Sequence, residues 1–134
     1  MQSQIKSQLF RYLVVGGITA VLYSGIVILC VEVLRLQREI SVSIGYFGAV
    51  FFHFNANRFF TFDARRGPVK TQVVRYVLLT MFNYCLTLLI VWGLGEWLGL
   101  PYFVSIFFSI GATVISGFVA SKLWVFAKRA MDVI

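Results

Sequence analysis

The side chains best suited to binding chemistry in this chain are cations and amides at the ends of apolar stretches. Arg58 closes a short polar cluster with His53, Asn55 and Asn57, and Lys122 ends a second, similar stretch. An arginine offers a planar fork to a phosphate, a lysine offers a point charge, and amides can bond to phosphate or sugar hydroxyls. The cluster therefore predicts a phosphate-binding site at a membrane boundary. The alternative is that both cations only fix the orientation of the chain and that the aromatic residues around them form an interfacial belt.

The chain lacks the residue groups that hydrolytic or transfer catalysis needs. His53 is the only histidine, and Asp63 and Asp132 are the only carboxylates among the basic segments. Catalysis would call for a carboxylate pair, a nucleophile with its base, or metal ligands at a recognisable spacing. We therefore predict a protein that is not an enzyme and has no metal or cofactor. A histidine at the end of an apolar span is as readily a packing residue as a proton carrier.

The composition indicates that lipid is the solvent. Of 134 residues, 60% are hydrophobic and 13% are charged, which is more apolar surface than a soluble domain can hide. The net charge of +7 comes from short basic segments between apolar spans, so nucleic acid is not expected as a partner. Cys30 and Cys85 lie inside apolar spans and imply neither a disulfide nor a metal site. The first apolar span is too long for the core of a cleavable signal peptide.

Four apolar stretches are long enough to cross a hydrocarbon core of about 30 Å as helices. The expected transmembrane helices are Tyr12–Leu34, Ile40–Asn57, Val73–Leu98 and Tyr102–Trp124. Residues 1–11 are expected to form a short interfacial lead-in, in which a helical turn could lay Ile5, Leu9 and Phe10 against the headgroup region.

Small residues recur at helical spacing in two of these helices, which predicts close contact between helix backbones. In the first helix they are Gly16, Ala20 and Ser24. In the fourth they form a longer stripe, made of Ser105, Ser109, Ala112, Ser116 and Ala120.

The chain repeats itself. An offset of about 64 positions aligns 10–62 with 74–126 without a gap. The identical pairs are Arg11/Arg75, Tyr12/Tyr76, Leu22/Leu86, Ile26/Ile90, Val27/Val91, Glu32/Glu96, Leu34/Leu98, Leu36/Leu100, Ser41/Ser105, Val50/Val114, Phe54/Phe118, Ala56/Ala120 and Phe62/Phe126. We predict an all-α membrane protein whose four transmembrane helices are built from two parallel two-helix repeats. The single domain, 1–134, would comprise repeat one (10–62), a linker (63–73) and repeat two (74–126).

The basic residues predict the orientation, because cytoplasmic loops are enriched in Lys and Arg. Ten of them share one side: Lys6, Arg11, Arg58, Arg65, Arg66, Lys70, Arg75, Lys122, Lys128 and Arg129. Arg35 and Arg38 lie on the other. Both termini and the linker are therefore expected in the cytoplasm. The inner mouth would carry Arg11, Arg58, Arg75 and Lys122. Glu32 and Glu96 would lie at the outer rim, either as solvated or ion-paired residues or in a coupling role.

Short motifs at the helix ends resemble the GtrA-like family of small membrane proteins. They are Phe10-Arg11-Tyr12-Leu13-Val14-Val15-Gly16-Gly17, Asn57-Arg58-Phe59-Phe60-Thr61-Phe62, Arg75-Tyr76 and Lys122-Leu123-Trp124-Val125-Phe126. The resemblance covers about residues 9–127. It implies a four-helix protein of the bacterial inner membrane that translocates a polyprenyl-phosphate-linked sugar, such as undecaprenyl-phosphate glucose, for cell-surface polysaccharide. Related helices form the membrane domain of some dolichyl-phosphate mannose synthases.

The leading hypothesis is therefore a flippase for a lipid-linked sugar, with Arg58, Lys122, Asn57, Asn55, Arg11, Arg75 and His53 as substrate-binding candidates. Four helices cannot enclose a long isoprenoid tail, so the polar head would travel along a groove while the tail stays among membrane lipids. A homo-oligomer is expected, because it would widen that groove. The main alternative is a membrane anchor or scaffold for a glycosyltransferase partner. A small multidrug exporter fits poorly, because the chain has no acidic residue deep in the bilayer.

Overall fold

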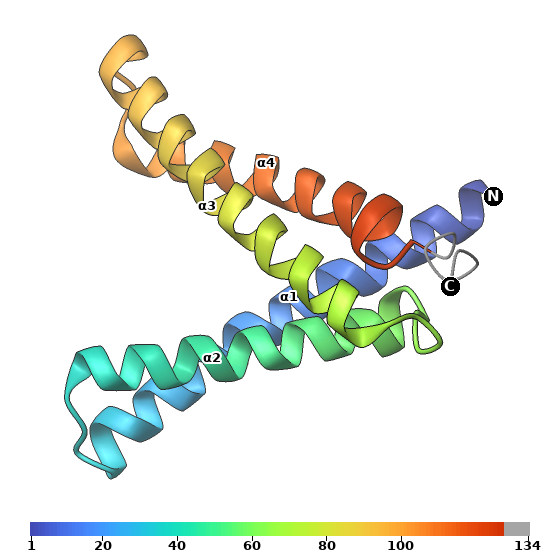
Figure 1. Cartoon of the computed structure of the whole chain (residues 1–134). Coiled ribbons are helices and arrows are strands. Elements are labelled where there is room, and N and C mark those ends of the chain that lie inside the picture. Colours follow the sequence, from blue (N-terminus) through green and yellow to red (C-terminus); the bar gives the residue numbers. More distant parts are fainter. Residues whose placement is uncertain (128–134) are drawn as a thin grey trace. The chain divides into compact units, whose positions relative to one another are not determined.

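The computed structural model describes residues 1–127 as helices joined by short connections, with no strand among them (Figure 1). The element order is α1 (Gln2–Ile28), η1 (Leu29–Val33), α2 (Arg38–Ala56), η2 (Asn57–Thr61), α3 (Val69–Leu98), α4 (Tyr102–Ala120) and η3 (Ser121–Val125). The three η segments are π-helices that continue the preceding α-helix. The predicted all-α fold is confirmed. Lys128 and Arg129, expected among the cytoplasmic cations, lie outside the described residues.

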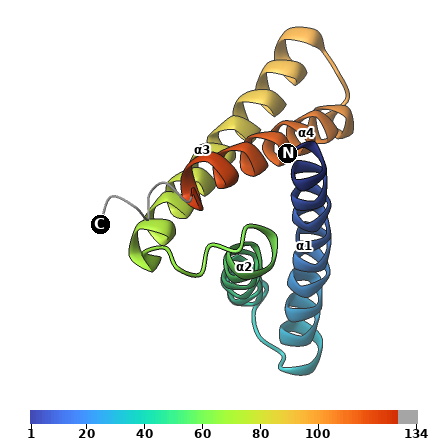
Figure 2. The same ribbon diagram turned by 90° about the vertical axis from the view of Figure 1, so that its right-hand side faces the viewer.

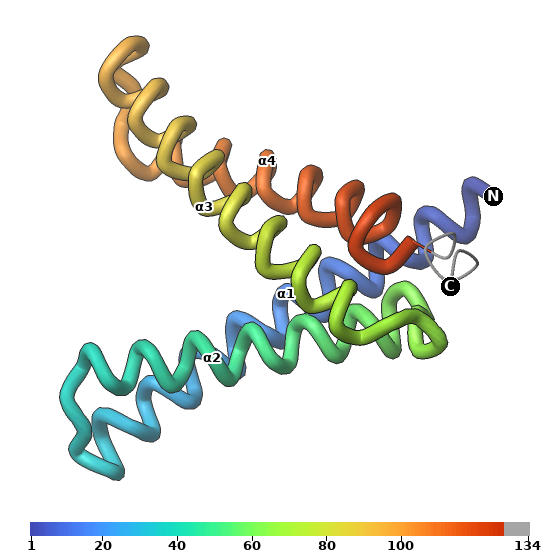
Figure 3. Tube along the Cα trace, in the orientation of Figure 1, coloured from blue at the N-terminus to red at the C-terminus, as the bar shows by residue number. Residues whose placement is uncertain are grey.

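The chain divides into two compact units, Met1–Arg65 and a second that begins at Arg66. Unit 1 is the hairpin of α1 and α2, and unit 2 is the hairpin of α3 and α4; each pair can be followed as a continuous tube in Figure 3. The bounds of α2 with η2 and of α4 with η3 differ by the same offset that relates the two sequence repeats. The two units therefore have equivalent second helices, each ending in a π-turn.

Small residues of α2 bring the two helices of unit 1 together. Ser41 and Gly45 are buried, and a Cβ added at Gly45 would lie 2.6 Å from Cγ2 of Val27 on α1. The large aromatics Phe47 and Phe51 are 72% and 73% exposed. The small residues of α2 thus face α1, and Phe47 and Phe51 face outward, whereas Phe54 is buried.

Two expectations concern α1. The helix begins at Gln2 and runs without a break to Ile28, so residues 1–11 are its first turns, and their place at the membrane interface stays a prediction. The small residues Gly16, Ala20 and Ser24 do not form the contact of α1 with α2. A Cβ at Gly16 would meet nothing within 4 Å, and Ala20 and Ser24 are exposed. Regularly spaced small residues permit close approach of another helix, but the close approach of α1 and α2 occurs at Gly45 of α2.

In unit 2 the first two residues of the small stripe of α4 are buried as expected, whereas Ala112, Ser116 and Ala120 are half-buried. Ser105 and Ser109 are 0% and 3% exposed. The Ser116 hydroxyl donates to Oδ1 of Asn83 on α3 at 2.6 Å, a hydrogen bond between the helices. The view in Figure 2 shows α3 and α4 joined by their short connection. This bond joins two polar side chains of an apolar helix pair, as expected where lipid offers no partner.

Within residues 1–127, three helical segments are long and apolar enough to cross a membrane: Gln2–Val33, Val69–Leu98 and Tyr102–Val125. The predicted transmembrane helix Ile40–Asn57 falls outside this group; its last part carries the polar residues His53, Asn55 and Asn57. It still runs alongside α1 as its partner. The chain is a multi-pass membrane protein.

Candidate functional site at the basic end of unit 1

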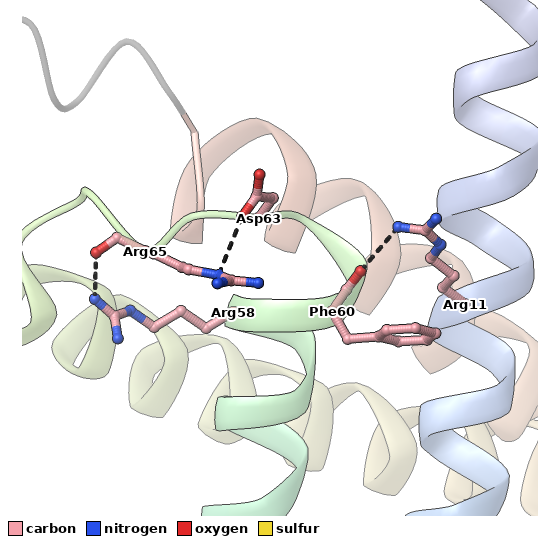
Figure 4. A network of polar contacts seen from close by, with 5 residues as sticks. All are labelled: Arg11, Arg58, Phe60, Asp63 and Arg65. Carbon is pink, nitrogen blue, oxygen red and sulfur yellow. Dashed lines mark hydrogen bonds and ion pairs between the residues drawn. The ribbon is translucent and has the colours of Figure 1, made fainter.

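Arg11 ties the two helices of unit 1 together where η2 ends. Its Nη1 donates to the backbone carbonyl of Phe60 at 3.1 Å, and its Cζ lies 5.1 Å from the centroid of the Phe60 ring (Figure 4). The last carbonyls of a helix have no partner within the helix, and the helix dipole makes that end negative. Arg11 therefore caps the second helix of the hairpin from the first.

Unit 2 contains the same cap. Arg75 Nη1 donates to the carbonyl of Trp124 at 2.7 Å, and Cζ of Arg75 lies 5.7 Å from the Trp124 ring. In the alignment of the two repeats, Arg75 corresponds to Arg11 and Trp124 corresponds to Phe60. The sequence predicted Arg11 and Arg75 as ligand-binding cations. The structure gives each a capping role, and their contact with a phosphate stays a prediction.

Arg58 is largely buried, with 8% of the residue exposed. Its Nη2 donates to the carbonyl of Arg65 at 2.9 Å, which closes the turn after η2. Its Cζ also lies 5.0 Å from the centroid of the Phe59 ring. The guanidinium that the sequence singled out is therefore held in place by its own turn (Figure 4).

Arg65 adds a second guanidinium that the sequence placed only in the linker. Its Cζ lies 5.8 Å from the same Phe59 ring, and its Nε lies 3.3 Å from Oδ1 of Asp63. Its side chain is 66% exposed. Asp63 itself has φ +46°, the left-handed conformation that reverses the chain here. Two arginines thus contact one aromatic ring, with one exposed carboxylate beside them.

The amides predicted to support Arg58 bond along their own helix. Asn55 Nδ2 donates to the carbonyl of Phe51 at 2.8 Å. Asn57 is 1% exposed; its Nδ2 lies 3.2 Å from Nε2 of His53, and its Oδ1 accepts from the hydroxyl of Thr61 at 2.8 Å. His53 therefore belongs to a polar cluster with Asn57 and Thr61, and Tyr12 packs edge-on against its ring at 5.8 Å.

The remaining candidates lie elsewhere. Lys122 is half-buried in η3, at the position of unit 2 that corresponds to Arg58. Glu32 is exposed in η1, and Glu96 is exposed near the end of α3. Within unit 1, the structure thus brings Arg11 and Arg58 to the same helix end and places Glu32 at the other. That Arg58 and Lys122 lie together at one inner mouth stays a prediction.

The sequence could have pointed to some of the missed contacts. Phe59 and Phe60 lie within the motif already recognised, and aromatics beside arginines are a known stacking pattern. The carbonyl acceptors carry no such signal, because every residue has one.

The family model for the GtrA/DPMS transmembrane domain matches residues 11–126, which is most of the chain. The comparison with curated proteins found no match, and neither did the comparison with solved structures. Domains of this family are generally non-catalytic. The chain therefore belongs to the GtrA/DPMS transmembrane-domain family, which ties this multi-pass membrane protein to lipid-linked sugar metabolism.

Proposed function

We propose that this protein translocates a polyprenyl-phosphate-linked hexose from the cytoplasmic to the outer leaflet of the bacterial inner membrane, for glycosylation of cell-surface polysaccharide. It does so without catalysing a reaction, and as a homo-oligomer. The phosphate enters at the basic end of unit 1, and the isoprenoid tail stays in lipid. Both termini lie in the cytoplasm, in keeping with the bias of Lys and Arg.

The observation that carries the proposal is the pair of guanidiniums against Phe59. Arg58 and Arg65 lie 5.0 Å and 5.8 Å from that ring, so two positive charges are gathered at one helix end. Like charges held together at a membrane edge favour an anion between them, and guanidinium groups match phosphate geometry. Asp63 offsets part of this charge from the exposed side of Arg65. The site is open to a ligand through Arg65, whose side chain is the more exposed of the two.

The test is transport by the purified protein in liposomes that contain a polyprenyl-phosphate hexose, measured as movement of the sugar between leaflets. Arg58→Lys keeps the charge but loses the planar fork, and Arg65→Gln removes the exposed cation. Losing one charge-assisted hydrogen bond, about 1.5–3 kcal/mol, weakens binding roughly ten- to a hundredfold. Arg66→Gln is the matched control, because it removes the same charge from the neighbouring exposed position.

Each variant is first checked for insertion, for orientation by tag accessibility at both ends, and for thermal stability, because Arg58 also closes a turn. We expect Arg58→Lys and Arg65→Gln to slow transport and Arg66→Gln to leave it unchanged. Full transport by correctly inserted Arg58→Lys and Arg65→Gln proteins would move the phosphate site elsewhere. Mixed orientations of the wild type would overturn the assignment of the cytoplasmic end.

A second candidate is a non-transporting anchor for a glycosyltransferase. It is favoured by the exposed aromatics of α2, Phe47 and Phe51, which could equally pack on another membrane protein. Liposomes that contain this protein alone separate the two functions. Transport in these liposomes, without any enzyme, supports the flippase. A lack of transport supports the anchor.

A further inference from the structure

A groove of about 310 Å³ lies in unit 1 beside the connection between η1 and α2, at the end opposite Arg11 and Arg58. We call it the α1–α2 groove. It is lined by Val27, Ile28, Val31, Glu32, Arg38 and Val42. Four of these six are aliphatic, so the groove offers an apolar wall with one carboxylate and one guanidinium.

The backbone beside the groove is unusual. Val31 and Glu32 belong to the π-helix η1, Leu29–Val33. The corresponding part of unit 2 remains α-helical, because α3 runs unbroken to Leu98. π-turns within α-helices occur often at functional sites. This backbone feature thus distinguishes the first helix of repeat one from that of repeat two.

The charged pair of the groove is also specific to unit 1. Glu32 corresponds to Glu96, but Arg38 corresponds to Tyr102, so unit 2 keeps only the carboxylate. The groove described between α3 and α4 is lined by apolar residues and glycine, among them Leu89, Gly93 and Phe108. The two repeats therefore differ in chemistry at this end.

The two charged side chains of the groove, Glu32 and Arg38, do not form an ion pair with each other. Over residues 1–127 no ion pair within 4.0 Å joins Glu32 to Arg38. A carboxylate accepts hydrogen bonds from hydroxyls, and a guanidinium donates them. Together with an aliphatic wall, this combination suits a group rich in hydroxyls that is attached to an apolar chain.

We infer that the α1–α2 groove is a second subsite, which binds the sugar of the lipid-linked substrate through Glu32 and Arg38 at the far side of the membrane. This inference rests on the proposed function. It separates two tasks within unit 1: the basic end binds the phosphate, and the groove binds the hydroxyls of the sugar after the headgroup has crossed.

The test compares two ligands on the purified protein, a polyprenyl-phosphate hexose and the same polyprenyl phosphate without sugar. The wild type is expected to bind the hexose form more tightly. Glu32→Gln and Arg38→Gln should each reduce that preference roughly tenfold, as for one lost hydrogen bond to a charged group, and leave affinity for the bare lipid unchanged. Glu39→Gln is the matched control, since Glu39 is exposed next to Arg38 and does not line the groove.

The unchanged affinity for the bare lipid also shows that each variant is folded. If Glu32→Gln and Arg38→Gln keep the full preference for the hexose, the groove is not the sugar subsite. Equal binding of both lipids by the wild type would likewise overturn this inference while phosphate recognition stands. If the wild type binds neither lipid, the proposed function fails and the subsite with it.

Discussion

Gly45 should be the position at which unit 1 tolerates an added methyl group least. An alanine Cβ there would lie 2.6 Å from Cγ2 of Val27 and 3.3 Å from Cδ2 of Tyr23. Carbon atoms pack best at about 3.5–4.0 Å, so something must move. Val27 cannot simply rotate away, because a valine in a helix has one strongly preferred rotamer. The helices themselves would have to separate.

Overpacking of this kind costs about 1–3 kcal/mol, which lowers the folding equilibrium constant roughly 5- to 150-fold. Gly17→Ala on α1 is the control, because a Cβ there meets nothing within 4 Å and alanine is the better helix former. The measurement is the free energy of unfolding in micelles, from a denaturing-detergent titration followed by circular dichroism.

The cause can be isolated with Val27→Ala, which removes the clashing methyl. In the pair with Gly45→Ala, the two changes should offset each other by about 0.5–3 kcal/mol, the range for residues in contact. The close approach of α1 and α2 at this point would be refuted if the Gly45→Ala protein had the same free energy of unfolding as the wild type. It would also be refuted if the losses of the two single variants simply added in the double variant.

Three further predictions concern stability in the same assay. Arg75→Gln should cost about 1.5–3 kcal/mol, because the carbonyl of Trp124 loses a charged donor; an unchanged value would show that the cap adds nothing. Ser109→Leu should disrupt packing in unit 2 because the serine is 3% exposed, and normal assembly would mean that this face of α4 is loosely packed. Arg35→Gly should stabilise by about 1 kcal/mol, because Arg35 has φ +55° where the other repeat has Gly99 at φ +62°; a loss of stability would argue that the arginine side chain has a role of its own.

The sequence by itself determined the helices and the repeat. Apolar spans in lipid must satisfy their backbone groups internally, so composition and length lead directly to helices. The repeat offset then relates positions that turn out to be equivalent, such as the buried Ser41 and Ser105. The helix ends were less well predicted. The polar start of the chain extends α1 to Gln2, since polar residues can continue a helix beyond the apolar span.

Only the tertiary structure decided which groups contact which. Small residues at positions 16, 20 and 24 indicated a packing face on the first helix, yet the close approach to α2 occurs at Gly45, because spacing marks a possible face and says nothing of its partner. The caps by Arg11 and Arg75 could not be predicted, because their acceptors are backbone carbonyls, which every residue carries. Arg65 joined the site through the left-handed turn at Asp63, which folds a linker residue back over Phe59. Periodicity along a chain fixes which side of a helix is apolar, whereas a site forms where separate segments meet, and that depends on how the turns and helix contacts direct them.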